Sequence, residues 1–197
     1  MKIRIILLSM IMSIFAGNLL ADNQNNTTLG IKIMAGGRYD DMRMCVGSDA
    51  GVKGGPIADV MLLFKRNIKP NVDLAFELPV MRPILFGTAF KLLQFEPQVS
   101  MEFNKQISSK SSLILAPGVG VSFHYGPDYK SDLDNRGEDF FAVGPIVSGL
   151  IGYSFHSKTA KKKIAGIRFF YIPLFSSESS LSPGQVFGAV LETHFHL

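Results

Sequence analysis

Apolar and polar side chains alternate with a period of two along most of the chain. In the C-terminal segment, Phe187, Leu191 and Phe195 share one parity, whereas Glu192 and His194 share the other. Successive side chains of a β-strand point to opposite faces, so each such segment predicts a strand with one apolar and one polar face.

This alternation predicts an all-β fold, a single closed antiparallel transmembrane β-barrel of about eight strands. An even number of strands with both termini on one side suits a single-chain barrel, and eight strands leave an interior that side chains can fill. The predicted strands are residues 29–40, 56–65, 71–81, 88–104, 112–125, 140–156, 164–175 and 185–197.

The segments between these strands are of two kinds. Three are short and basic, which predicts tight periplasmic turns: residues 65–71, 104–110 and 157–163. The others are mostly longer and rich in Gly, Asp, Ser and Pro, which predicts outward loops: residues 41–55, 82–87, 126–139 and 176–184.

Aromatic residues on the apolar parity fall in two bands, as at the two boundaries of a bilayer. The band predicted at the periplasmic rim is Phe64, Phe103, Phe155 and Phe195, and the band predicted at the outer rim is Tyr39, Tyr125, Phe141, Phe175 and Phe187. The alternative is that they are core aromatics of a soluble secreted barrel of the lipocalin kind, which would bind a small apolar ligand.

The N-terminus predicts an export signal. Lys2 and Arg4 precede an apolar run over residues 5–15, and Ala21 is the expected cleavage position. We therefore divide the chain into a signal peptide, 1–21, and a barrel domain, 22–197; a buried N-terminal helix is the alternative. The single cysteine, Cys45, lies too far along to be a lipidated first residue, and it excludes an intrachain disulfide.

Composition is consistent with a membrane barrel. The chain is 47% hydrophobic and 18% charged, yet it holds no long apolar run after the signal. Alternation reconciles these facts, because it dilutes hydrophobicity along each strand. The net charge of +4 includes Lys2 and Arg4, so the mature chain carries about +2 (4 − 2), which gives no support for a nucleic-acid partner.

Two features indicate a family: strand-to-basic-turn units such as Val99-Ser100-Met101-Glu102-Phe103-Asn104-Lys105, and the terminal Thr193-His194-Phe195-His196-Leu197 behind a signal. With these, the chain resembles the small eight-stranded bacterial outer-membrane barrels, the group of OmpX, the OmpA membrane domain and the opacity-type surface antigens. The resemblance implies a non-enzymatic protein of the outer membrane, with lipid as its surroundings. Its loops would have a structural or adhesin-like role and contact extracellular or host-surface ligands.

The chain departs from this group at two points. It ends in Leu197 rather than in an aromatic residue. Proline also recurs inside predicted strands, where it cannot donate a ladder hydrogen bond. These prolines imply bulges or errors in the predicted strands: Pro79, Pro97, Pro117, Pro145 and Pro173.

The inward parity carries the charges. A Lys or Arg facing lipid at mid-membrane costs roughly 2–4 kcal/mol, whereas inside a narrow lumen opposite charges can pair. We predict a structural interior network, with a narrow porin-like path as the alternative, for which inward Gly118, Gly120, Gly144, Gly152 and Ala116 would leave room. The network residues are Lys32, Arg38, Asp59, Asp73, Glu77, Glu96, Glu102, Arg168 and Glu192; Lys65, Gln94 and Gln98 share their parity.

No catalytic residue, metal ligand or cofactor site is predicted. Ser122 and His124 share a parity, but it is the inward one, whereas a lipid-directed hydrolase needs its Ser and His on the lipid face. His194 and His196 share a face without enough further ligands for a metal. The acidic loop around Asp132 fails the EF-hand template, because Arg136 stands where an oxygen ligand is needed.

Overall fold

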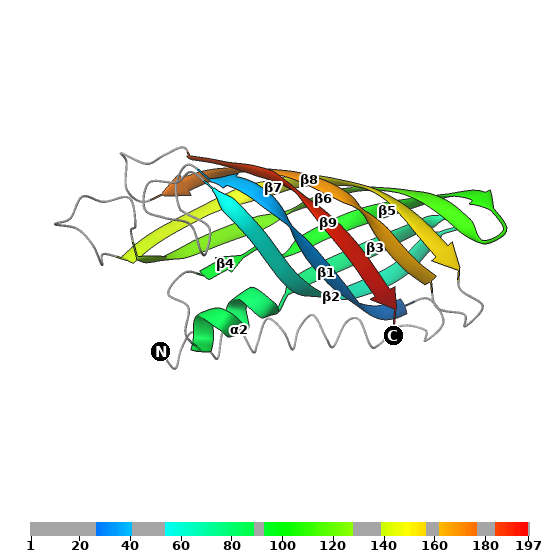
Figure 1. The fold of residues 1–197 in the computed structure, drawn as a ribbon, viewed down its shortest axis with the longest axis horizontal. Coiled ribbons are helices and arrows are strands. Elements are labelled where there is room, and N and C mark those ends of the chain that lie inside the picture. The colour runs from blue at the N-terminus through cyan, green and yellow to red at the C-terminus, as the bar shows by residue number, and fades with distance from the viewer. Residues whose placement is uncertain are drawn as a thin grey trace.

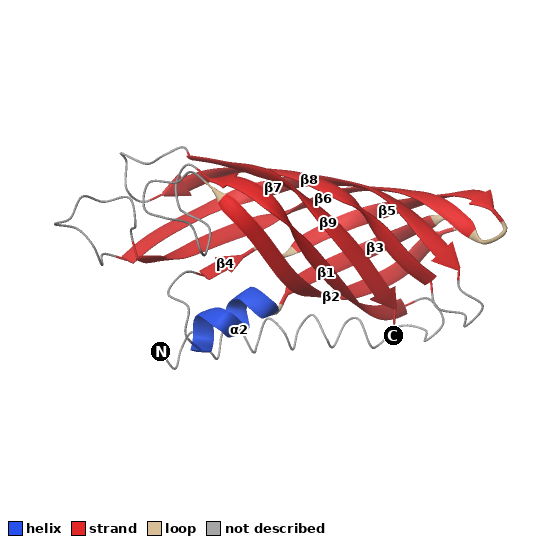
Figure 2. Cartoon of the chain, viewed as in Figure 1, coloured by secondary structure: helices blue, strands red, loops and turns tan. Residues whose placement is uncertain are grey.

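The computed structural model describes residues 27–40, 54–88, 93–127, 139–156, 162–176 and 184–196. Strands form almost all of this part of the chain (Figures 1 and 2), and none of its helices is long and apolar enough to cross a membrane. The elements are β1 (Thr27–Asp40), β2 (Gly55–Lys69), β3 (Val72–Pro79), α2 (Met81–Thr88), β4 (Leu93–Phe95), β5 (Gln98–Ser108), β6 (Ser111–Pro127), β7 (Asp139–His156), β8 (Lys162–Ser176) and β9 (Gly184–His196).

The strands close into one antiparallel barrel, which confirms the predicted fold class. Their order is β4-β6-β5-β3-β2-β1-β9-β8-β7, and β6 also pairs with β7, which completes the ring. The first and last strands are neighbours, with Ile33 opposite Thr193. β4 and β5 both pair with β6, so they are two parts of one barrel strand, which makes eight in all.

The two faces of the wall differ as the alternation predicts. Large apolar side chains are exposed on the outer face of every long strand, among them Val119 on β6, Ile151 on β7 and Leu191 on β9. The predicted girdle aromatics Phe103, Phe141, Phe155, Phe175, Phe187 and Phe195 are also exposed there. An outer surface of this composition suits contact with hydrocarbon rather than with water.

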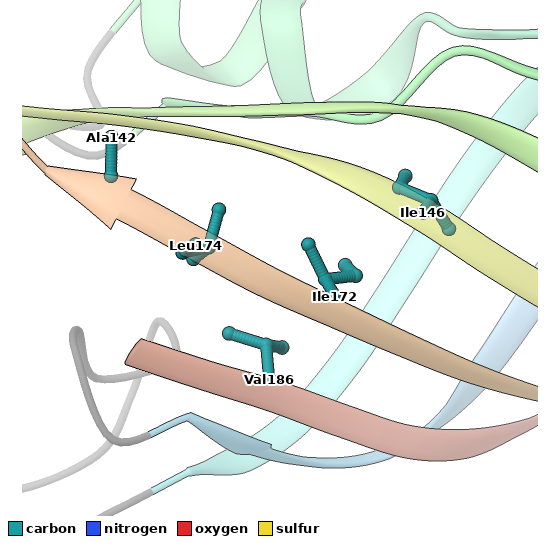
Figure 3. Close-up of a cluster of buried hydrophobic side chains, with 5 residues drawn as sticks. All are labelled: Ala142, Ile146, Ile172, Leu174 and Val186. Atoms are coloured by element: carbon teal, nitrogen blue, oxygen red, sulfur yellow. The ribbon is translucent and has the colours of Figure 1, made fainter. Parts of the chain in front are cut away.

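The interior is not purely polar. Figure 3 shows one of three buried apolar clusters, formed on the inner face of β7, β8 and β9 by Ala142, Ile146, Ile172, Leu174 and Val186. The other two are Met34, Ile57, Met61 and Val190, and Ile114, Ala116, Leu150 and Ile164. Apolar side chains therefore fill the parts of the lumen that the charged groups leave.

Two of the turns predicted to be periplasmic lie within the described residues, and both are tighter than predicted. Strands β2 and β3 continue to a turn at Pro70 and Asn71, and Asn71 has a φ of 66°. Proline followed by a left-handed residue fits a type II turn. Ser109 and Lys110 form the turn between β5 and β6. Residues 157–161, and most of the predicted loops 41–55, 126–139 and 176–184, lie outside the described residues, as do Cys45 and the predicted signal peptide.

The prolines interrupt the ladders without shifting the register, so the bulges predicted for Pro117, Pro145 and Pro173 are wrong. The register of β7 against β8 places Pro145 and Pro173 opposite each other, and the pairs on both sides keep the same alignment. Pro117 likewise falls in a gap between two aligned stretches of β5 and β6. Pro79 ends β3, and Pro97 lies between β4 and β5. Each proline thus sits where the ladder lacks a hydrogen bond that it could not donate.

The segment after β3 is the main departure from the prediction. We expected strand to residue 81, a loop over 82–87, and strand again from 88, but Met81–Thr88 is helix α2. The alternation fails here, because five of its residues are apolar and nearly consecutive. Pro83 falls in the first turn, where its missing N–H removes no intrahelical hydrogen bond.

Two adjacent glycines of β1 provide a matched test of this wall. A Cβ on Gly36 would lie 2.2 Å from the carbonyl oxygen of Ala189, whereas a Cβ on Gly37 would meet nothing within 4 Å. We expect Gly36→Ala to lower the free energy of unfolding by about 1–3 kcal/mol, because backbone must shift. Gly37→Ala should have little effect. Urea unfolding in lipid vesicles measures both, and equal effects would contradict the close approach of β1 and β9.

Candidate functional site

Arg168 of β8 is the centre of the buried polar network, and it is only 1% exposed. Its Nε donates to Glu192 at 2.7 Å, and its Nη2 donates to Glu77 at 2.9 Å. Its Nη1 donates to the Ser148 hydroxyl at 3.0 Å. Lys32 Nζ donates to Glu77 and lies 3.6 Å from Glu192, so both carboxylates face two cations.

The same network continues toward the end of the barrel that carries the Pro70 and Ser109 turns. Lys65 Nζ lies 2.7 Å from Glu102 and 3.2 Å from a ring nitrogen of His194, and the other ring nitrogen lies 2.8 Å from Glu192. The inner cluster consists of Lys32, Lys65, Glu77, Gln98, Ser100, Glu102, Ser148, Arg168, Glu192 and His194. Its three cationic side chains match its three carboxylates.

A second group lies nearer the outer end, around Arg38 of β1. Its guanidinium donates to Asp40 at 3.1 Å, Glu96 at 3.2 Å and the Gln94 side-chain oxygen at 3.1 Å. The ring of His124 lies 3.3 Å from the same guanidinium. The outer cluster consists of Arg38, Asp40, Asp59, Arg82, Gln94, Glu96, Ser122 and His124.

Sequence analysis missed Arg82, the residue that completes the outer cluster. Arg82 lies on α2, and its Nε donates to Asp59 at 2.6 Å while Nη2 donates to Glu96 at 2.9 Å. The sequence places it in a predicted outward loop, and strand parity has no meaning for a helix. One feature of the sequence could have identified it, because Arg82 is the only charged residue in the otherwise apolar segment that forms α2.

Asp73 is placed apart from the other predicted network residues. It is half-buried at the inner end and accepts hydrogen bonds from Asn67 at 2.8 Å and Asn104 at 3.2 Å. These residues line an open polar cavity of about 330 Å³ together with Asn71, Gln106, Ser108, Ser109 and Ser112. Parity predicts which face of the wall a residue lies on, but not its position along the barrel axis. Asp73 therefore lies at the open polar cavity at the end of the barrel and not in the buried network.

The small inward residues do not leave the room that we expected. A Cβ on Gly118 would lie 2.8 Å from the Ser148 hydroxyl, and one on Gly144 would lie 1.9 Å from the Pro173 carbonyl oxygen. Neighbouring backbone and side chains therefore already occupy the space beside these glycines.

Ser122 and His124 are buried inside the barrel. The Ser122 hydroxyl donates to Glu96 at 3.2 Å, and His124 lies 3.5 Å from the same carboxylate. Both side chains are within the outer cluster rather than on the outer face of the wall. His194 is likewise engaged within the inner cluster, and among the described residues no group of three His, Cys, Asp or Glu could hold a metal ion.

The whole arrangement of the barrel matches a solved structure. Neisserial surface protein A (NspA) has a TM-score of 0.52 and 10% identity, over 88% of this chain and 100% of that chain. The chain has the fold of the small eight-stranded outer-membrane barrels. At the level of the fold, this confirms the resemblance seen in the sequence.

Two further solved barrels match with lower scores. The N-terminal barrel domain of Pseudomonas aeruginosa OprF has a TM-score of 0.38 and 10% identity, over 85% of this chain and 97% of that chain. Ail, the attachment invasion locus protein of Yersinia pestis, has a TM-score of 0.42 and 14% identity, over 87% and 98%. No protein-family model matches the chain, and no curated protein matches its sequence.

Arg168 offers a test of the network in this small barrel. Arg168→Ala would leave Glu77 and Glu192 short of a cation in a buried site, and we expect a loss of about 3–5 kcal/mol in stability. Replacement of the exposed Arg66 of β2 by Ala should change stability by much less. Thermal unfolding in lipid vesicles makes the comparison.

Planar-bilayer recordings of the same variants test the alternative of an ion path. We expect conductance to stay at background for wild type and for Arg168→Ala. Steady ion-selective channels that Arg168→Ala alters would show that the network lines a pore.

Proposed function

We propose that this chain is an integral protein of the bacterial outer membrane, without enzymatic activity, whose barrel presents its outer loops for surface recognition. The observation that carries the proposal is the sorting of side chains across the wall. Large apolar groups cover the outer face, while Lys32, Arg168 and Glu192 are buried inside.

This sorting is the reverse of what a soluble barrel needs. A lipocalin-like protein would keep apolar groups inside and expose polar groups to water. Here Phe169, Leu191 and Val119 are more than half exposed on the outer face. Lipid would cover these groups, and a charge moved to that face would cost about 2–4 kcal/mol for Lys or Arg.

Membrane residence can be tested by fractionation. The mature chain should sediment with the outer membrane, should need detergent for extraction, and should migrate differently on a gel with and without heating. The reason is that its exposed apolar surface has no partner in water. Recovery as a soluble periplasmic monomer would contradict the proposal and favour the lipocalin-like alternative.

The recognition role rests on the position of the loops. The connections after β1, β6 and β8 all leave the barrel at the end opposite the Pro70 and Ser109 turns, as antiparallel order requires. Loops held on a rigid scaffold tolerate change and commonly carry binding. An adhesin-like role through contact with an extracellular or host surface is the form that we propose.

Shortening the connection at residues 128–138 to a tight turn tests this role. Folding and heat-modifiability should persist, because the β6–β7 ladder is untouched, while binding to host-cell surfaces should fall. The control is a variant in which the polar residues of the same loop are shuffled, so that the loop keeps its length and only its sequence changes. Loss of the folded form with the short loop would contradict the division between scaffold and loop.

Protease on intact cells tests the orientation. Trypsin should cut at Lys130 or Arg136 and spare Lys161. Cleavage at Lys161 with Arg136 protected would place the loops on the periplasmic side.

A further inference from the structure

The barrel wall is interrupted at its outer end between β2 and β4. The ladder of β2 with β3 begins at Met61, so residues 55–60 pair with β1 on one edge only, apart from one hydrogen bond from the Val80 amide to the Val60 carbonyl. β4 pairs with β6 alone. Among the described strands, none bridges these two free edges. A barrel in lipid normally leaves no edge open, because unpaired backbone groups are costly there.

Helix α2 lies over this gap. It contacts both β2 and β4, and Figure 1 shows it against the wall beside them. The ring of Phe86 meets the ring of Tyr125 on β6 edge-on, with centroids 6.0 Å apart. Ile84 is 62% exposed, so the helix turns at least this apolar side chain outward, as the strands do theirs. Within the described residues, the two edges are therefore joined by side chains of a short helix instead of a backbone ladder.

One polar side chain crosses the gap from α2. Arg82 reaches Asp59 on β2 at 2.6 Å and Glu96, next to β4, at 2.9 Å, so it joins the two free edges. Its side chain keeps 11% exposure, whereas Asp59 is fully covered. If α2 moves away with Arg82, the buried Asp59 loses the guanidinium that it contacts, and Glu96 keeps only the guanidinium of Arg38 among the arginines of the outer cluster. The exposed site then needs a cation.

We propose that the gap between β2 and β4 is a lateral portal latched by Arg82, and that Asp59 and Glu96 behind it bind the cationic head of a long-chain amine from the lipid phase. Helix α2, which now fills the site, resembles such an amine chemically. It combines one cationic group, the guanidinium of Arg82, with an apolar run of Met, Pro, Ile, Leu and Phe. An anionic amphiphile would meet the excess of carboxylates and is disfavoured.

The test uses the full chain in zwitterionic lipid vesicles, with dodecylamine as the probe and dodecanoate as its anionic counterpart. Arg82→Met removes the competing cation and keeps an apolar side chain. We expect it to bind dodecylamine with a Kd roughly tenfold lower than wild type, and not to bind dodecanoate. The triple variant that adds Asp59→Asn and Glu96→Gln to Arg82→Met should lose this increase in affinity for dodecylamine. Equal binding of amine by wild type and folded Arg82→Met, or equal binding of dodecanoate, would overturn the proposal.

Arg168→Met is the matched control. It removes a more deeply buried guanidinium from the inner cluster, where neighbouring strands are paired by ladders, and should gain no amine binding. A gain equal to that of Arg82→Met would mean that any unpaired carboxylate binds the probe, and would overturn the portal.

Movement of α2 is tested without removing Arg82. In a Cys45→Ser background, Phe86→Cys with Tyr125→Cys can join α2 to the wall by a disulfide. Dodecylamine should bind after reduction, and oxidation should lower the bound fraction. In a separate variant, Phe86→Trp provides a reporter in a chain that has no tryptophan, and its emission should shift with the amine and not with dodecanoate. Binding that oxidation does not change would overturn the gating role of α2. These binding tests do not depend on the results of the loop and fractionation experiments. The portal proposal can therefore be contradicted while the proposed membrane residence holds.

Discussion

The interior of the barrel depends on the bonds that one guanidinium makes across the lumen. Arg168 extends from β8 and contacts Glu192 on β9, Glu77 on β3 and Ser148 on β7. Lys32 of β1 joins the same two carboxylates, so five strands meet at one set of charges. In the membrane that we propose, lipid would exclude charge from the outer face, and the narrow lumen brings the inward charges close enough to neutralise one another. The alternation of the strands, the burial of the charges and the filling of the lumen are thus parts of one constraint.

Sequence alone could predict the faces of the wall because parity is a local property. The exposed aromatics Phe141, Phe155 and Phe195 and the buried Glu77 and Arg168 all lie on the faces that their strands imply. The pairing of Lys32 with Glu77, which are 45 positions apart, could not be predicted in this way. It depends on how far each strand is staggered against the next, and no single segment records that stagger. The position of Asp73 at the open polar cavity has the same cause.

The prediction failed where the alternation itself stops. Met81 to Phe86 carries apolar groups on both parities, and proline and glycine beside them suggested a loop. A lipid-facing helix and a loop share this composition, and the difference is made by the neighbouring edges of β2 and β4, which the helix covers. Arg82 gains its role from that placement. It links two strands through Asp59 and Glu96 at the point where the backbone ladder between them is missing.

The two ends of the barrel are therefore held in different ways. Around the inner cluster the ladders of β6 with β7 and of β8 with β9 are continuous, and only that of β5 with β6 is interrupted, at Pro117. The side chains there match three cations with three carboxylates. At the outer end the ladder is absent between β2 and β4, and it is broken again where Pro145 faces Pro173 between β7 and β8. Local opening is cheapest where backbone hydrogen bonds and tight packing are fewest. Changes of shape should therefore be confined to the outer half, next to the loops, while the ionic core near Arg168 keeps the rest of the wall in place.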